Sequence, residues 1–296
     1  MLQRTLAIVA VILALVDPAH GQRSSSRWDV MDDQTITRTL SFAAGGSRTL
    51  DVRNITGSIR VEATDDSTVQ MSIHKVIRAE SRADVADAQR EVQIDFIDGT
   101  ARVGATVTEA NRHVCGEQWE DDQGRRWQRR NYSFTFDFTI RVPRDTALRL
   151  CTINGGDVTV TGTRGDFDID NVNGLIEMNR VAGSGSAQTV NGPVSVSFAA
   201  NPTQASSFKT VNGNVDVRFS DGLSADFSMK TMNGGLFTDF DSQPLPTATT
   251  KGERRDGRFV YRANRSTRVR VGRGGPEITF ETLNGNVRAR RVGSAQ

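Results

Sequence analysis

The amino-acid sequence predicts an all-β protein: a single-domain parallel β-helix or β-solenoid with coils of about 20 residues. The first observation is an Asn-Gly pair that recurs six times, preceded by an apolar residue and followed by an alternating strand. The pairs are Asn154-Gly155, Asn173-Gly174, Asn191-Gly192, Asn212-Gly213, Asn233-Gly234 and Asn284-Gly285. The second observation is their spacing, because successive Asn residues lie 19, 18, 21 and 21 residues apart, and then 51. A period of this kind indicates repeats that each bury an apolar face against the next.

An antiparallel β-meander or sandwich is the alternative fold. Asn-Gly between alternating strands is typical of hairpins with type I′ turns, in which both central residues have positive φ. However, Gly162, Gly183 and Gly222 mark a second turn about halfway between the pairs, so Asn-Gly returns only once in every two strands. Stacked coils explain this arrangement, and we expect the Asn212 side chain to stack on Asn191 and Asn233.

The chain begins with a segment that resembles a secretory signal peptide. Arg4 precedes an apolar run at residues 6–16, and small residues precede Gln22. The run is too short to span a bilayer, so residues 1–21 are interpreted as a cleaved signal peptide. We therefore expect an exported protein, periplasmic, on the cell surface or secreted, with no stable membrane span after removal of the signal.

Residues 22–35 are polar and predict a tether, and residues 36–147 predict strands, one helix and a loop that together cap the solenoid. Thr56-Gly57 stands where a repeat would have Asn-Gly, as in an atypical terminal copy. Ser81 followed by Asp84 resembles a helix N-cap, and apolar spacing then predicts a short helix near residues 81–92. A hairpin turning at residues 98–99 follows.

The loop at residues 109–131 is the candidate binding surface. Acidic residues precede Gly124 and arginines follow it, so a hairpin folded there would pair opposite charges and the two tryptophans. The candidate binding residues are Trp119, Arg125, Arg126, Trp127, Arg129 and Arg130. A salt-bridged hairpin lid without a binding role is the alternative.

Cys115 and Cys151 are the two cysteines of the chain. An exported protein meets oxidising conditions, so one disulfide between them is predicted. Two separate buried thiols are the alternative.

Residues 148–292 contain the Asn-Gly repeats, interrupted by an excursion at residues 242–265 that accounts for the long last interval. Positive charge concentrates at this end, where residues 251–296 hold 12 Lys or Arg and 4 acidic residues although the net charge of the whole chain is +2. These arginines could attract anionic polymers, although their alternation with apolar residues favours an ordinary solvated face.

Several short motifs follow one another in a fixed order along the chain. They are Gly57, a helix followed by Asp98-Gly99, Arg141-Val142-Pro143, the repeated V-N-G-x-V-x-V pattern and the final Leu283-Asn284-Gly285-Asn286-Val287. This order resembles the bacterial DUF4097 family, an exported group labelled as adhesins largely on the basis of fold. The resemblance implies a parallel β-solenoid and a cell-envelope setting. The loop at 109–131 and the arginine-rich end depart from the family pattern.

Candidate chemistry is sparse. Asp166, Asp168, Asp170 and Glu177 have calcium-loop spacing, but Asn171 replaces the required Gly and the segment alternates as a strand, which favours a solvated face. Outside the predicted signal peptide the histidines are His74 and His113, and no metal, nucleophile or phosphate-loop motif accompanies them. Asp157, Asp168 and Asp216 could form a carboxylate row on a polysaccharide-active β-helix.

We expect a non-catalytic, exported structural or binding module of the cell envelope, adhesin-like, without a cofactor or metal. An envelope protein or polysaccharide is the expected partner, and nucleic acid is not. The alternatives are a polysaccharide-active enzyme on a β-helix scaffold and a periplasmic sensor or regulatory protein.

Overall fold

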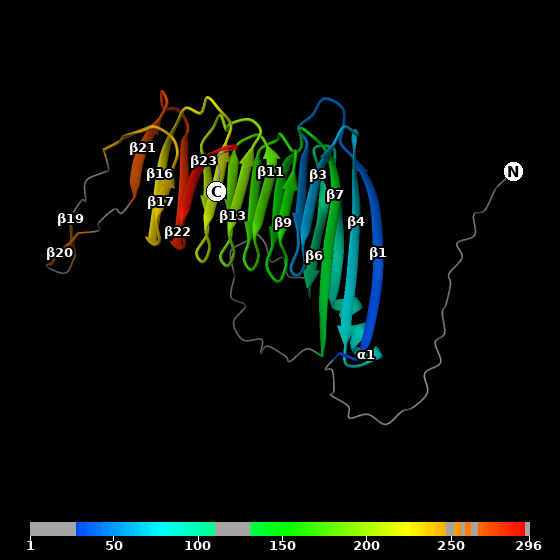
Figure 1. The fold of residues 1–296 in the computed structure, drawn as a ribbon. Helices are drawn as coiled ribbons and strands as arrows, with labels where there is room; N and C mark the ends of the chain where they lie inside the picture. Colours follow the sequence, from blue (N-terminus) through cyan, green and yellow to red (C-terminus); the bar gives the residue numbers. More distant parts are fainter. Residues whose placement is uncertain (1–27, 110–130, 247–251, 256–257, 262–265, 294–296) are drawn as a thin grey trace.

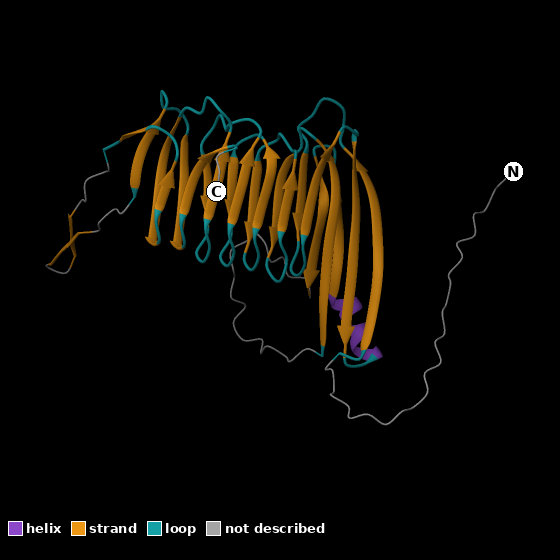
Figure 2. Cartoon of the chain, viewed as in Figure 1, coloured by secondary structure: helices purple, strands orange, loops and turns teal. Residues whose placement is uncertain are grey.

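The computed structural model describes residues 28–109, 131–246, 252–255, 258–261 and 266–293. These residues form two large facing sheets, here called sheet A and sheet B, that run along an elongated stack (Figures 1 and 2). The prediction of an all-β chain with one short helix is confirmed for this part of the chain.

Sheet A has ten strands. Their spatial order is β1 (Val30–Ser41), β4 (Thr68–Ala79), β7 (Tyr132–Pro143), β3 (Ile59–Thr64), β9 (Val158–Thr161), β11 (Ile176–Val181), β13 (Val194–Phe198), β15 (Val215–Phe219), β23 (Val287–Arg291) and β17 (Leu236–Thr238). β1 includes residues 30–35, the last part of the segment predicted as a tether, because it pairs over its full length with β4.

Sheet B has eleven strands. Their spatial order is β18 (Ser242–Pro244), β21 (Thr267–Val271), β16 (Ala225–Asn233), β22 (Glu277–Asn284), β14 (Ser206–Lys209), β12 (Gly185–Gln188), β10 (Phe167–Asn171), β8 (Ala147–Thr152), β2 (Thr49–Arg53), β6 (Arg102–Glu109) and β5 (Val92–Asp98). A separate hairpin consists of β19 (Gly252–Arg255) and β20 (Arg258–Tyr261).

The helix α1 (Arg82–Glu91) begins after Ser81, whose hydroxyl accepts a hydrogen bond from the backbone N–H of Asp84 at 3.2 Å. Its one buried residue is Ala88, and the helix contacts β1, β4, β5 and β7 at one end of the stack. Among the residues that the structure describes, no helix is long and apolar enough to cross a membrane.

Each repeat unit consists of a strand of sheet B, an Asn-Gly turn and a strand of sheet A. Strands of adjacent units pair in parallel within each sheet, as β10 does with β8 and β12. Antiparallel pairs lie at the two ends of the stack, where β4 pairs with β1 and β7, and β21 pairs with β16. The Asn-Gly turns are the short loops along the lower edge of Figure 2.

The last repeat unit is inserted into the stack out of chain order. β22 pairs with β14 on one side and β16 on the other, while β23 pairs with β15 and β17. The unit at residues 225–238 is therefore separated from the unit at residues 206–219 by the unit at residues 277–291.

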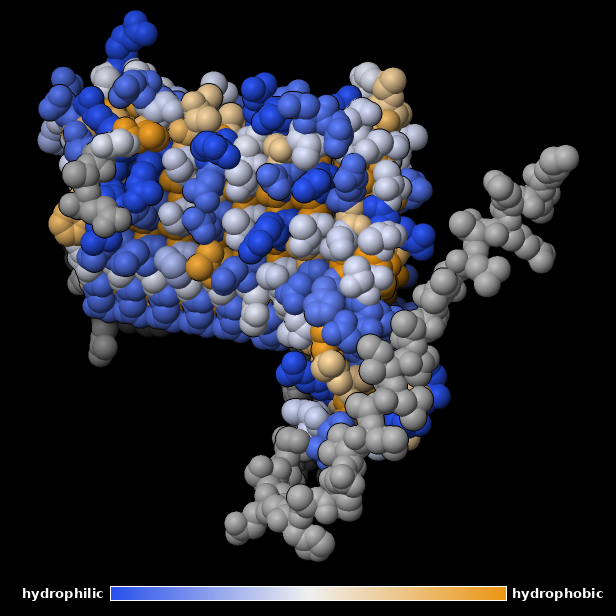
Figure 3. Space-filling model, turned by 45° about the vertical axis from the view of Figure 1, so that its right-hand side comes forward, coloured by the Kyte–Doolittle hydropathy of each residue, from blue (hydrophilic) through white to orange (hydrophobic). Residues whose placement is uncertain are grey.

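Alternation along the strands decides which side chains enter the core. In β15 the residues Val215, Val217 and Phe219 are buried between the sheets, while Asp216 and Arg218 lie on the outer face. On the face seen in Figure 3, hydrophilic and intermediate residues cover most of the surface, with apolar residues visible between them.

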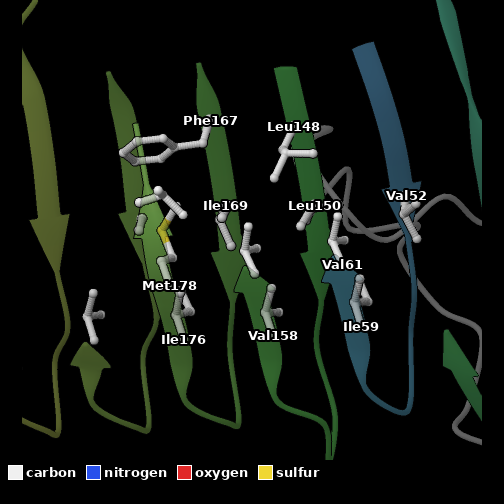
Figure 4. Close-up of a cluster of buried hydrophobic side chains, with 14 of the residues drawn as sticks. Val52, Ile59, Val61, Leu148, Leu150, Val158, Phe167, Ile169, Ile176 and Met178 are labelled. Atoms are coloured by element: carbon white, nitrogen blue, oxygen red, sulfur yellow. The ribbon is translucent and has the colours of Figure 1, made fainter. Parts of the chain in front are cut away.

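The core changes character along the stack. Near its middle it is mainly aliphatic, with Ile59, Val158 and Ile176 of sheet A facing Leu150 and Ile169 of sheet B (Figure 4). Towards the last repeat units it is aromatic. The phenylalanines in contact there are Phe167, Phe198, Phe208, Phe219, Phe227, Phe240 and Phe280. This continuous apolar layer holds the two sheets together.

Candidate binding surfaces

The residues predicted as a binding surface lie outside the described residues. They are Trp119, Arg125, Arg126, Trp127, Arg129 and Arg130. Cys115 lies outside them as well, whereas Cys151 is half-buried on β8. The predicted disulfide therefore stays a prediction, which intact mass measured with and without reductant can test.

The Asn side chains of the Asn-Gly pairs form one continuous row of hydrogen bonds. The Nδ2 of Asn173 donates to Asn154, that of Asn191 to Asn173, that of Asn212 to Asn191, that of Asn284 to Asn212 and that of Asn233 to Asn284, at 2.7–3.2 Å. The expectation that Asn212 contacts Asn233 was wrong, because the inserted last unit places Asn284 between them.

Close stacking requires the Gly in five of the six pairs, the exception being Gly155, whose added Cβ would have nothing within 4 Å. A Cβ on Gly213 would lie 2.1 Å from the carbonyl oxygen of Gly192, and a Cβ on Gly174 would lie 2.1 Å from that of Gly156. Arg180 is the one described non-Gly residue with positive φ, so no Asn of the row has the conformation that a type I′ turn requires.

A third feature of the repeat was missed in the sequence. The residue two positions before the Asn is a Thr in five of the six repeats, and its hydroxyl donates to a Gly carbonyl of a neighbouring unit. These residues are Thr152, Thr189, Thr210, Thr231 and Thr282, with O···O distances of 2.7–2.9 Å. In the remaining repeat the residue at this position is Asn171, whose side-chain Nδ2 donates to the Gly156 carbonyl oxygen at 3.0 Å. The repeated Thr-x-Asn-Gly pattern was visible in the sequence and signals these bonds.

The outer face of sheet B carries a shallow groove of about 460 Å³. Adjacent strands contribute a polar row across it, since Asp168 is in register with Ser186, Ser186 with Ser207, and Ser207 with Thr279. Ser186 donates to the Asp168 carboxylate at 2.7 Å. Gly185 and Ala205 line the groove with little side-chain volume, and Glu277 lies at its far end.

A second polar row follows on the same face. The Nε2 of Gln188 donates to Asp170 at 2.6 Å, and burial raises the pKa of the Asp170 carboxyl, with Asp168 adding to the effect. Lys209, Glu281 and Lys230 continue this row on the next strands.

The residues with calcium-loop spacing do not converge. Asp168 and Asp170 lie on β10 and bond to the next unit, and Asp166 accepts from the backbone N–H of Ser184 at 2.9 Å. Glu177 lies on β11 in the other sheet. Within the described ranges, no group of His, Cys, Asp and Glu is arranged to hold a metal ion.

The carboxylates suggested for a polysaccharide-active row are also separated. Asp168 is on sheet B, Asp216 is on sheet A, and Asp157 accepts from the backbone N–H of Leu175 beside an Asn-Gly turn.

The two histidines outside the predicted signal peptide do not form a site with these carboxylates among the described residues. His74 pairs with the exposed carboxylate of Asp33 on β1 at 2.8 Å, and His113 lies outside the described residues.

Several C-terminal arginines contact groups of the same chain. Arg270 makes a bidentate pair with Asp226 at 2.8 Å for both bonds, and Arg290 pairs with Asp216. The guanidinium carbons of Arg288 and Arg291 lie 5.6 Å and 5.2 Å from the ring centroids of Phe237 and Phe240. These arginines therefore bind the last units together, and they do not form one free basic surface.

Comparison with known proteins gives only distant likenesses. No protein-family model matches the chain, and no curated protein matches it. A structure named a putative cell adhesion protein, from Clostridium sporogenes, covers 87% of this chain and 100% of its own, with a TM-score of 0.42 and 6% identity. A structure named a putative adhesin, from Bacteroides fragilis, covers 88% of this chain and 97% of its own, with a TM-score of 0.28 and 10% identity. Neither likeness reaches a TM-score of 0.5, so the function of this chain has to be inferred from its own residues.

Proposed function

We propose that the chain is an exported, non-catalytic binding module of the cell envelope, adhesin-like in role, built as a parallel β-solenoid. The parallel register of successive repeat units and the continuous Asn row support the solenoid. The proposed ligand is an extended polysaccharide that lies on the outer face of sheet B.

The observation that carries this proposal is the row Asp168, Ser186, Ser207 and Thr279 along the groove. Neighbouring strands of a sheet lie about 4.8 Å apart, so this row offers hydrogen-bonding groups at regular intervals across four strands. Hydroxyls both donate and accept hydrogen bonds, and carboxylates accept them. A hydroxyl-bearing polymer crossing the strands would meet one polar group at each strand.

A retention experiment tests the proposal. The protein is passed over immobilised envelope and plant polysaccharides, and the soluble fraction is analysed for released oligosaccharides. We expect retention on at least one polymer without release of product. Release of oligosaccharides would support the enzymatic alternative and overturn the non-catalytic part of the proposal.

A matched pair of variants locates the binding face. Ser207→Arg places a long side chain in the groove and should abolish retention, whereas Ser195→Arg places the same side chain on the outer face of sheet A and should leave retention unchanged. Equal retention of both variants would show that the groove on sheet B is not the binding site.

A further inference from the structure

A second hollow, of about 640 Å³, lies at the strand ends opposite the Asn-Gly turns. Three arginines line it, namely Arg144, Arg164 and Arg180. The rest of the lining consists of small residues, which are Gly162, Ala182, Ala199 and Ala200. The hollow is thus an open space lined by arginines and small residues.

The charges in this hollow are only partly compensated. Arg144 pairs with the exposed carboxylate of Asp65 through bonds of 2.6 and 3.2 Å, which lowers the pKa of that carboxyl. Arg164 and Arg180 form no ion pair with any residue that the structure describes. Positive charge therefore exceeds negative charge in the lining.

Arg180 has an unusual backbone conformation. Its φ is 51°, and it is the one non-Gly residue with positive φ among those described. It lies where the pairing of β11 with β13 shifts register, between Met178 and Val181. Left-handed backbone is strained for a residue with a Cβ, and such strain is often kept at functional sites.

The previous repeat unit shows how this position is normally occupied. Asn179 is in register with Thr161, so the residue equivalent to Arg180 is Gly162, with φ of 76°. Gly adopts this conformation without steric cost. The chain therefore carries Arg at a position that the neighbouring unit fills with Gly, and the register shift directs the Arg180 side chain into the lining of the hollow.

Guanidinium groups bind oxyanions through paired, charge-assisted hydrogen bonds. The hollow is larger than an inorganic ion requires and lies within the range of small-molecule sites. We propose that it binds a phosphate or sulfate ester carried on a group of monosaccharide size. This site lies apart from the groove on sheet B and does not depend on it.

Binding of defined probes by calorimetry tests the site. Glucose 6-phosphate, glucose 6-sulfate, glucose and inorganic phosphate are titrated into the full-length protein. We expect both esters to bind and glucose not to bind, with the preferred ester identifying the oxyanion. Binding of glucose equal to that of the esters would overturn the proposal, and inorganic phosphate binding as tightly as glucose 6-phosphate would overturn its monosaccharide-sized part.

The decisive variant is Arg180→Gly, which removes the guanidinium and suits the local backbone. We expect it to lower the affinity for the bound ester by about tenfold or more, as loss of a charge-assisted bond predicts, while its melting temperature stays within about 2 °C of the original. Arg60→Gln, which removes an exposed arginine on the outer face of sheet A, should leave the affinity unchanged. Ser207→Arg should also leave it unchanged, which separates this site from the groove. Unchanged affinity in Arg180→Gly would overturn the proposal.

Discussion

Asn284 and Asn212 are 72 residues apart in the sequence, yet the Nδ2 of Asn284 donates a hydrogen bond of 2.7 Å to the Oδ1 of Asn212. The last repeat unit of the chain therefore stacks directly on the unit at residues 206–219. The unit at residues 225–238, which precedes it in the sequence, forms the outer neighbour. Charges on the outer face of sheet B agree with this order, because Glu281 lies between Lys209 and Lys230.

Reversing the charge at Glu281 should destabilise the stack. Glu281 pairs with Lys230 at 2.5 Å, and direct stacking of β14 on β16 would instead bring two lysines together. Like charges on adjacent strands are unfavourable, so Glu281→Lys should lower the free energy of unfolding by about 1 kcal/mol in denaturant titration.

The second change Lys230→Glu should restore part of that loss, because it recreates an opposite pair. If Glu281→Lys has no effect on stability and Lys230→Glu gives no rescue, these strands are not neighbours in solution.

Adding a single methyl group at Gly213 should disrupt stacking. Its Cβ would lie 2.1 Å from the carbonyl oxygen of Gly192, a backbone atom that can move only if the units separate. Overpacking of this kind costs about 3 kcal/mol, so Gly213→Ala should lower the unfolding midpoint clearly. Gly46→Ala is the control, since nothing lies within 4 Å of its added Cβ. Similar unfolding midpoints for Gly213→Ala and Gly46→Ala would contradict the close approach of Gly213 to the Gly192 carbonyl oxygen.

Removing the hydroxyl of Thr210 tests the bond that the sequence interpretation missed. Thr210 is 4% exposed and donates to the Gly192 carbonyl at 2.7 Å. Thr210→Val keeps the shape and loses the donor, so the free energy of unfolding should fall by about 1–3 kcal/mol. Thr159→Val, on the outer face of sheet A, should change it little. If the free energy of unfolding fell equally in both variants, the hydrogen bond from Thr210 to Gly192 would not be the cause of the destabilisation.

The pair of Asp226 and Arg270 should make stability depend on pH at acidic values. The hydrogen bonds from Arg270, and then its charge and that of Arg268, lower the pKa of Asp226 although burial opposes them. The pKa of Asp226 is therefore lower in the folded state than its unfolded value of about 3.9. The stabilisation by the pair is fully present above the unfolded pKa, and it is lost as the pH falls through the folded-state pKa.

Melting temperatures measured between neutral pH and about pH 3 check this expectation. Asp226→Asn should melt below the original protein at neutral pH, and the difference should shrink as the pH falls. Asp221→Asn, at an exposed turn, should show no such convergence. If the melting temperatures of Asp226→Asn and the original protein differed by the same amount at every pH measured, the lowered pKa of Asp226 would be contradicted.

Local patterns predicted most of the strands, the helix and its cap, but they assigned residues 30–35 of β1 to a tether and left β18–β20 within an excursion. Alternation in segments such as residues 215–219 predicts which side chains are buried, because side chains along a strand point to opposite faces. The Asn-Gly period predicts equivalent turns. The Thr hydroxyls could have been found as well, since their position relative to the Asn repeats with the same period.

The Arg144, Arg164 and Arg180 hollow could not be predicted in the same way. Arg144 and Arg164 lie in the turns before β8 and β10, whereas Arg180 lies near the end of β11, so their convergence depends on how the units stack. Arg180 looks like any polar residue at a strand end until its φ of 51° and its equivalence to Gly162 are known.

The sequence by itself determined the period, the inward and outward faces and the position of each turn, because these follow from local spacing and residue size. Only the tertiary structure decided which unit stacks on which, and therefore that Asn284 lies between Asn212 and Asn233. Repeat units present similar edges, so local pattern alone allows several stacking orders. The order found here depends on contacts between residues far apart in the chain, such as Glu281 with Lys230 and Phe280 with Phe208 and Phe227.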